Sequence, residues 1–427
     1  MQEAENISIY RRRREQLAQA MRSGVAVIAT APERVRNRDS HFPYRFDSHF
    51  YYLTGFAEPE AVLVLSSGKS ILFCRERNPE REVWDGFRYG PERAKERFGF
   101  DEAHPIDELD DALAQLLENQ PALFYPVGDD AQWDARAMGW LNAVRAKVRA
   151  GVSAPDRVQD VRTLIDDQRL IKDTHEQNLM RRAARIAAGA HRRAMQSTRP
   201  GRSEYEVEAE LLYEFRRNGA QFPAYSPIVA GGANACVLHY VANDAPLRDG
   251  DLLLIDAGCE LDGYASDITR TFPVSGRFTR EQREIYVVVL RALEAATAAV
   301  RPGRHMHEID AVARRIIEKA GYGDAFMHGI GHQLGIDVHD ATPDGPLKAG
   351  MIITIEPGIY LPDCKIGIRL EDDILVTPRG PRNLTAMIPR RPEQVEAMMR
   401  AAARRAATTP RRPPARSRAA AGGSRKR

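Results

Sequence analysis

The sequence lacks a long apolar run and a secretion signal. A membrane span needs about 18 consecutive apolar residues, and the most promising stretch, Tyr286–Val300, is interrupted by Arg291 and Glu294. The first residues carry charge but no apolar segment follows them, as a secretion signal would require. We therefore expect a cytoplasmic protein that makes no membrane contact.

Cysteine is also scarce. The chain has four cysteines, with no CxxC pair and no regular spacing: Cys74, Cys236, Cys259 and Cys364. This pattern excludes a disulfide framework and argues against a zinc knuckle. We expect free thiols that are buried in the fold.

Acidic residues are absent from one end of the chain. Residues 400–427 contain ten Lys or Arg and no acid, so the net charge of +3 becomes −7 without them. The same segment is rich in Pro, Ala and Gly, a composition typical of disordered tails. A solubilising tail is favoured over a nucleic-acid arm, and we do not expect nucleic acid among the partners.

The length of 427 residues exceeds what one hydrophobic core usually organises, so two domains are expected. Residues 1–165 alternate short apolar runs with helical patterns such as Ile7–Met21 and Ile106–Glu118, which predicts an α/β domain. The polar stretch Ala154–Gln168 marks the boundary. A second domain then covers residues 166–395.

The second domain shows an internal repeat. Helical patterns at Thr174–Thr198 and Ser203–Asn218 are separated by Arg-Pro-Gly, and the pattern Thr279–Val300 also ends at Arg-Pro-Gly before another helix. This recurrence predicts a duplicated α+β domain, built from two halves of two helices and a sheet. A functional site is expected where the two sheets meet.

Two aspartates converge around a predicted hairpin. Asp256 follows four apolar residues and Asp267 lies beyond the turn signal Asp262-Gly263. A loop centred before Asp262 would set the two aspartates directly opposite each other. If Asp262-Gly263 is itself the turn, they become diagonal neighbours on one face, about 7 to 8 Å apart at Cα. A buried carboxylate at Asp256 needs a positive partner.

A second acidic pair lies in two further β-like runs. Glu356 ends the run ITIE before Pro-Gly, and Glu371 follows Arg369 by two residues, so these two side chains share a strand face. Asp372 and Asp373 are expected to be solvent-exposed or structural. Acids within apolar strands indicate a binding role.

Three histidines lie between the acidic pairs, in the segment FMHGIGHQLGIDVHD: His328, His332 and His339. Gly329 and Gly331 disfavour the helix that a His-x-x-x-His zinc motif needs. Four carboxylates in one pocket would repel one another unless cations were present. Two divalent ions would cancel that charge, and an oxygen-rich ligand set favours Mn²⁺, with Mg²⁺ or Co²⁺ as alternatives.

Residues about 170 to 390 resemble the catalytic domain of the pita-bread metallopeptidases, which include aminopeptidase P, prolidase and methionine aminopeptidase. The resemblance implies a pita-bread fold with a dinuclear metal site. It assigns five ligands in this sequence: Asp256, Asp267, His332, Glu356 and Glu371.

The resemblance also implies roles near the metals. His239 and His339 would steady the substrate and the tetrahedral intermediate, and His328 would shape a proline site. Tyr360 and Arg369 match a tyrosine and an arginine close to the site. Metal-activated water would attack the scissile carbonyl, with Glu356 as the candidate for moving its proton.

The segment Phe42–Leu65 resembles the corresponding segment of bacterial aminopeptidase P more than that of prolidase. It implies an aminopeptidase that removes the first residue from peptides whose second residue is proline, assembled as a homodimer or homotetramer. Proline has no amide hydrogen, so it needs a dedicated pocket. Three alternatives are a prolidase that takes only dipeptides, a metal-free creatinase-like protein, and a non-catalytic nucleic-acid-binding protein of this fold.

The sequence departs from the family pattern in two places. After Asp340 it continues ATPDGPLKAG, where relatives have a glycine soon after the aspartate. The basic tail after residue 399 has no counterpart, and no catalytic role is assigned to it.

Overall fold

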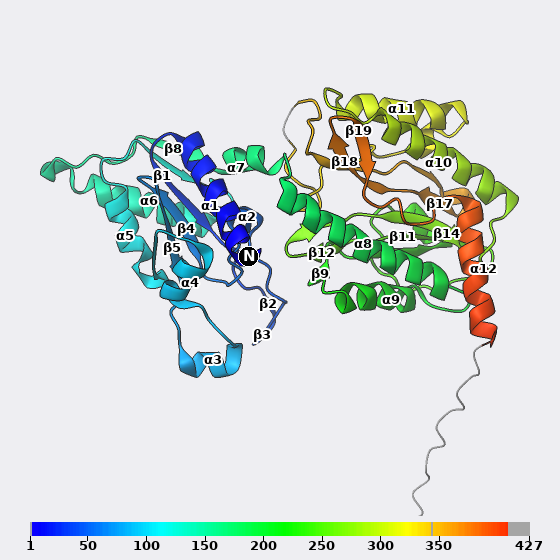
Figure 1. Cartoon of the computed structure of the whole chain (residues 1–427), viewed down its shortest axis with the longest axis horizontal. Helices are drawn as coiled ribbons and strands as arrows, with labels where there is room; N and C mark the ends of the chain where they lie inside the picture. Colours follow the sequence, from blue (N-terminus) through cyan, green and yellow to red (C-terminus); the bar gives the residue numbers. More distant parts are fainter. Residues whose placement is uncertain (1, 343–344, 409–427) are drawn as a thin grey trace, which may run out of the picture.

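The structure is a computed structural model that describes residues 2–342 and 345–408. An N-terminal domain and a larger C-terminal domain lie side by side (Figure 1). None of the helices in these residues is both long and apolar enough to cross a membrane.

A mixed six-stranded sheet forms the N-terminal domain, in the order β6-β5-β4-β1-β7-β8. Its strands are β1 (Val25–Ala29), β4 (Val62–Ser66), β5 (Lys69–Cys74), β6 (Glu102–Pro105), β7 (Ala122–Tyr125) and β8 (Arg157–Asp160). The short strands β2 (Val35–Asn37) and β3 (Ser40–His41) form a separate hairpin. Strands β1, β4 and β7 are almost wholly buried, as their apolar runs predict.

The helices of this domain are α1 (Gln2–Met21), α2 (Ser48–Thr54), α3 (Pro79–Asp85), α4 (Gly90–Phe98), α5 (Leu109–Leu116), α6 (Ala131–Arg145) and α7 (Arg162–Arg169). The 3₁₀ turns η1 (Ile106–Glu108) and η2 (Val148–Ala150) precede α5 and follow α6. The expected helices at Ile7–Met21 and Ile106–Glu118 therefore fall on α1 and on η1 with α5.

The polar stretch Ala154–Gln168, expected to mark the boundary, contains β8 and most of α7. Strand β8 is a parallel neighbour of β7, so backbone pairing rather than apolar periodicity holds it. The expected domain limit at residue 165 falls inside α7, and the division at 165/166 stays a prediction.

Two helix pairs frame the C-terminal domain: α8 (Thr174–Ser197) with α9 (Glu204–Arg217), and α10 (Arg280–Ala299) with α11 (Met306–Lys319). Each of the four helices begins with a reciprocal capping box, which satisfies backbone donors at both sides of the first turn. The three helical patterns with expected bounds are confirmed to within one or two residues, and the further helix expected after the second Arg-Pro-Gly is α11.

The strands between these helices form several small antiparallel sheets. The first half holds β9 (Phe222–Pro223), β10 (Ile228–Gly231), β11 (Leu252–Asp256), β12 (Cys259–Leu261), β13 (Tyr264–Ala265) and β14 (Thr269–Pro273). The second half holds β15 (Ile352–Ile355), β16 (Gly358–Leu361), β17 (Ile366–Arg369), β18 (Asp372–Thr377) and β19 (Gly380–Asn383). The remaining 3₁₀ turns are η3 (Gly232–Cys236), η4 (Gly323–Ala325) and η5 (Pro362–Cys364).

Helix α12 (Pro392–Thr408) follows the last strand. The segment 400–427 was expected to be disordered, and this is wrong for residues 400–408, which continue α12. Residues 409–427 lie outside the described residues. The expectation of buried thiols is also only partly right, because Cys74 and Cys259 are buried whereas Cys364 is exposed.

Candidate metal centre

The hairpin that carries the two aspartates turns at Asp262-Gly263. Leu261 pairs with Tyr264, and both turn residues have positive φ, 49° for Asp262 and 84° for Gly263. This conformation matches a two-residue type I′ turn. Of the two registers left open by the sequence, the one that makes Asp256 and Asp267 diagonal neighbours is therefore correct, and Asp256 pairs directly with Thr269.

A cavity of about 760 Å³ opens over this hairpin. Nine of the ten predicted site residues line it: His239, Asp256, Asp267, His328, His332, His339, Glu356, Arg369 and Glu371. The tenth, Tyr360, is buried behind the wall and contacts His328 and Arg369. Both halves of the domain therefore contribute to one site.

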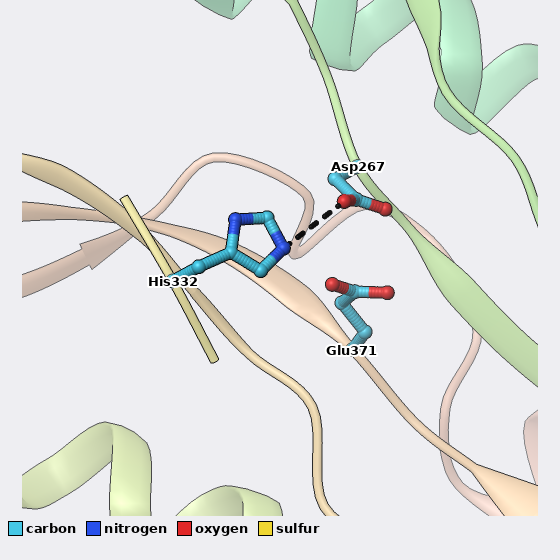
Figure 2. Close-up of side chains that lie close together, drawn as sticks. All are labelled: Asp267, His332 and Glu371. Carbon is cyan, nitrogen blue, oxygen red and sulfur yellow. Dashed lines mark ion pairs between the residues drawn. The ribbon is translucent and has the colours of Figure 1, made fainter. Parts of the chain in front are cut away.

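Three of these residues form a compact set of donor atoms. One ligand atom from each of Asp267, His332 and Glu371 lies within 4.8 Å of the other two. Figure 2 shows the imidazole and both carboxylates turned toward a shared space. Glu356 approaches from the same side, with its Oε1 3.6 Å from His332 Nε2.

The tautomer of His332 is fixed by its backbone. Its Nδ1–H donates to the carbonyl of Gln333 at 2.9 Å, which leaves Nε2 facing the carboxylates, 3.5 Å from Asp267. A metal-ligating histidine typically has such a hydrogen bond on its second nitrogen. Burial opposes a charge on this ring, yet the hydrogen bond to Asp267 and nearby carboxylates raise the pKa of His332 to about 9.

The carboxylates are crowded in a buried space. Burial raises the pKa of Glu356 to about 7, and it raises the pKa of Glu371 well above its ordinary value, together with the charges of Asp267, Glu356 and Asp256. Burial also raises the pKa of Asp256. Asp267 differs, because His332 lowers its pKa despite burial. Such repulsion is relieved by cations, so the donor set fits divalent metal ions.

Arg369 pairs with an aspartate of the first half. Its Nη2 donates to Asp256 Oδ2 at 2.6 Å, its Nη1 donates to the Tyr360 hydroxyl at 2.8 Å, and its Nε donates to Thr269 at 3.1 Å. Glu371 instead accepts from the Thr269 hydroxyl at 2.6 Å. Its carboxylate therefore remains available to a ligand.

Hydrogen bonds to both ring nitrogens fix the tautomer of His328. Its Nδ1–H donates to the Gly329 carbonyl at 2.9 Å, so Nε2 accepts from the Tyr360 hydroxyl, also at 2.9 Å. Burial lowers the pKa of His328 to about 4. Because both nitrogens are engaged, this side chain offers the cavity a ring surface rather than a proton.

Sequence reasoning missed Tyr225. Its hydroxyl lies 2.5 Å from Oδ1 of both Asp256 and Asp267, and it lines the cavity. The sequence signal was weak, since Tyr225 lies in an irregular segment between two prolines. Asp372 and Asp373 are both buried, so the solvent-exposed alternative was wrong, and Asp372 pairs with buried Arg270 at 2.6 Å.

The chain is similar to known proteins over almost its whole length. The model of metallopeptidase family M24 matches residues 178–378, and the model of the aminopeptidase P N-terminal domain matches residues 10–125. The Xaa-Pro aminopeptidase of Escherichia coli K12 is 43% identical over 92% of this chain and 97% of its own length.

Solved structures show the same similarity. Pseudomonas aeruginosa aminopeptidase PepP superposes with a TM-score of 0.91 at 45% identity, covering 93% of this chain and 99% of that one. A zinc-substituted Escherichia coli aminopeptidase P in complex with product gives 0.90 at 42% identity, covering 93% and 98%.

Proposed function

Because this chain belongs to metallopeptidase family M24, we propose that it is an Xaa-Pro aminopeptidase, which releases the first residue of peptides that have proline second. The main support for this proposal is that Asp267, His332 and Glu371 form one cluster of possible metal ligands. The cluster lies in a cavity that is large enough for part of a peptide. Relatives that share nearly the whole chain carry this name.

We propose that Asp256, Asp267, His332, Glu356 and Glu371 hold two divalent metal ions. When bound, the ions supply Lewis acidity and lower the pKa of a water molecule. Four carboxylates and one imidazole form a mostly oxygen ligand set, which supports Mn²⁺ as the native metal.

The other residues would bind the substrate and move its protons. Glu356 lies at the cavity wall beside His332 and is the candidate for accepting the proton of the attacking water. His239 and His339 line the same cavity and would hold the substrate and its developing negative charge. The neutral His328 would pack its ring against the proline, supported by the Tyr360 and Arg369 relay.

Apolar residues of the cavity suit a proline ring: Ile228, Leu238, Val241, Ile336 and Val338. Proline has no amide hydrogen, so its binding site needs no hydrogen-bond acceptor at that position. Apolar side chains can line the site without leaving a donor unpaired. A substrate with alanine in that position would contact less of this apolar surface.

We also propose a homodimer or homotetramer in the cytoplasm. Helix α3 buries none of its side chains within the chain, and it exposes 81% of Val83 and 82% of Trp84. Exposed apolar side chains of this size support contact with another copy.

Four free cysteines suit a reducing compartment such as the cytoplasm. The expected absence of nucleic acid among the partners stays a prediction.

The test compares Mn²⁺-loaded protein on Xaa-Pro-Xaa, Xaa-Ala-Xaa and Xaa-Pro peptides. We expect cleavage of the first set, with the alanine peptides cut roughly 10- to 200-fold more slowly, the range that pocket contacts supply. Equal rates on proline and alanine peptides would reject the specificity. Activity confined to Xaa-Pro dipeptides would indicate a prolidase.

A further inference from the structure

The loop that carries His339 is folded tightly on itself. Asp340 N–H donates to the Gln333 carbonyl at 3.0 Å, and Gly335 N–H donates to the Asp337 carbonyl at 3.0 Å. A Cβ at Gly335 would lie 2.1 Å from Asp340 Oδ2, so only glycine fits there. His339 lies between Asp337 and Asp340, and its ring meets His332 edge to face at 4.4 Å between centroids.

Two residues of the N-terminal domain hydrogen-bond to one side of this loop. Arg45 Nη2 donates to the Ile336 carbonyl at 2.8 Å, and the Ser48 hydroxyl donates to Asp337 Oδ1 at 2.5 Å. Arg45 is itself held, because Nε donates to Glu260 at 2.8 Å and Nη1 donates to Ser48 Oγ at 3.0 Å. Ser48 is buried, whereas the side chains of Arg45 and Asp337 are partly exposed.

Basic residues in helix α7 and just after it form ion pairs with the other side of the loop. Asp340 is buried and pairs with Arg169 and with Lys172 Nζ, the latter at 2.9 Å. Arg169 Nη2 also donates to Asp337 Oδ2 at 2.6 Å. One guanidinium thus joins the two acids that flank His339. Helix α7 lies at the junction of the two domains (Figure 1).

We propose that Arg45, Ser48 and Arg169 are positioning residues, which hold the Ile336–Asp340 loop so that His339 stays at working distance from the substrate. The inference rests on the proposed function. The two acids that these contacts hold are Asp337, two residues before His339, and Asp340, one residue after it, so the chain is anchored on both sides of the exposed imidazole. A displacement of about 1 Å at a reacting group can cost roughly 100-fold in rate. The N-terminal domain is therefore part of the catalytic apparatus rather than only an attached unit.

The experiment uses full-length Mn²⁺-loaded protein with the substitutions Ser48→Ala and Asp337→Ala. Ser48→Ala spares the α2 cap, because Asp47 provides it by accepting from Phe50 N–H. We expect kcat on an Xaa-Pro-Xaa peptide to fall roughly 10- to 100-fold while KM changes little, as when an interaction made mainly in the transition state is lost. Asp337→Asn should recover part of the loss, because its amide oxygen still accepts a hydrogen bond. Metal content and the melting temperature should stay close to wild type.

A double-mutant cycle with His339→Ala tests whether the effect acts through that imidazole. In the His339→Ala background, Ser48→Ala should lower kcat less than about twofold, because the group it positions is already absent. Arg12→Ala is the matched control: it removes another contact between the domains, to Asp173 at 3.2 Å, away from the loop. Its kcat should equal that of wild type.

Full kcat in both Ser48→Ala and Asp337→Ala, or additive losses with His339→Ala, would overturn the inference while leaving the proposed function intact. A loss of kcat in Arg12→Ala equal to that in Ser48→Ala would also overturn it, since general loosening of the interface would then explain both. If wild-type protein does not cleave Xaa-Pro-Xaa peptides, the proposed function fails and this inference fails with it.

Discussion

The two halves of the C-terminal domain turn their helix pairs in the same way. In the first half, Gly201 N–H donates to the Leu247 carbonyl at 2.9 Å, and in the second half Gly303 N–H donates to Leu347 at 2.8 Å. The return bonds, from Leu247 to Arg202 and from Leu347 to Arg304, are both 2.7 Å. Matching backbone bonds at matching places indicate that one unit was duplicated.

The halves differ in the acids that they bring to the cavity. The first half supplies aspartates that already have donors, since Tyr225 approaches Asp256 and Asp267 and Arg369 pairs with Asp256. The second half supplies Glu356 and Glu371, and burial raises the pKa values of both, as it raises that of Asp256. The halves differ in the partner of the raised acid: Asp256 pairs with the Arg369 guanidinium, whereas Glu371 accepts from the neutral Thr269 hydroxyl. Glu371 therefore depends more on an added cation.

The largest effect that tests this contrast is expected at Glu371. The substitution Glu371→Gln keeps the size and removes the charge, so the site should lose metal and roughly 10³-fold or more in kcat/KM, because metal stabilisation of the transition state is worth several kcal/mol. Metal-free stability should hardly fall, since relief of carboxylate repulsion offsets the weakened bond from Thr269. Elemental analysis, peptide kinetics and melting without metal provide the three measurements.

Asp256→Asn is the matched variant in the first half. It should also lose activity, but it leaves the buried Arg369 guanidinium without its ion pair, so metal-free stability should fall by about 3 to 5 kcal/mol. If Glu371→Gln instead keeps two metals and near-native turnover, or if the two variants melt alike, the contrast between the halves is wrong.

The sequence predicted the duplicated helices well because their signals are local. Capping residues, apolar periodicity and the Arg-Pro-Gly turns all act within a few residues, and the three helices with expected bounds begin and end close to those positions. The sequence placed the hairpin turn near Asp262-Gly263 but left two registers open, and the structure selects the one in which these two residues form the turn. The acids of the site stand out in the sequence because carboxylates within apolar strands are costly without a ligand. His239 and the assignment of the five ligands came instead from the family resemblance.

Contacts between distant segments could not be predicted in this way. Tyr225 reaches the aspartates only because the irregular chain before β10 passes over them. The pairing of Arg270 with Asp372 joins the two halves across the domain interior. The hydrogen bonds from Arg45 and Ser48 to the loop that carries His339 form only when the two domains pack together. The periodicity of apolar residues along a sequence does not show which distant residues will pair.

A smaller effect is expected at His191, a position where the halves differ in the core. His191 is fully buried in α8 and donates through Nε2 to the Ala257 carbonyl at 2.9 Å, whereas the matching residue of α10 is the buried Leu293. Burial lowers the pKa of His191 to about 4 from its ordinary 6.5. Between these values the unfolded chain binds a proton that the folded chain does not, so stability falls as the pH falls from 6.5 toward 4.

The loss should reach about 3 kcal/mol over that window, at 1.36 kcal/mol for each unit of pKa difference. His191→Gln keeps an amide donor for Ala257 but cannot titrate, so its unfolding free energy should depend less on pH. Urea unfolding of metal-free protein at several pH values between 4.5 and 7 measures the difference. Parallel pH profiles for wild type and His191→Gln would show that this histidine is not buried in its neutral form.

The smallest effect is expected at the two Arg-Pro-Gly turns, where the halves should respond equally. Gly201 and Gly303 both have φ of +87°, a Cβ at either would meet nothing within 4 Å, and both follow a proline as the third residue of a type II turn. Gly201→Ala and Gly303→Ala should therefore each lower the free energy of unfolding by about 1 kcal/mol, the cost of a side chain in the left-handed region, without changing kcat. Gly139→Ala in the middle of α6 is the control: its φ is not positive and no atom crowds it, so it should raise stability by about 0.5 to 1 kcal/mol. Urea unfolding measures all three, and a difference larger than about 0.5 kcal/mol between the two turn variants, which is the usual error of additivity for separate sites, would mean that the turns do not have equivalent surroundings.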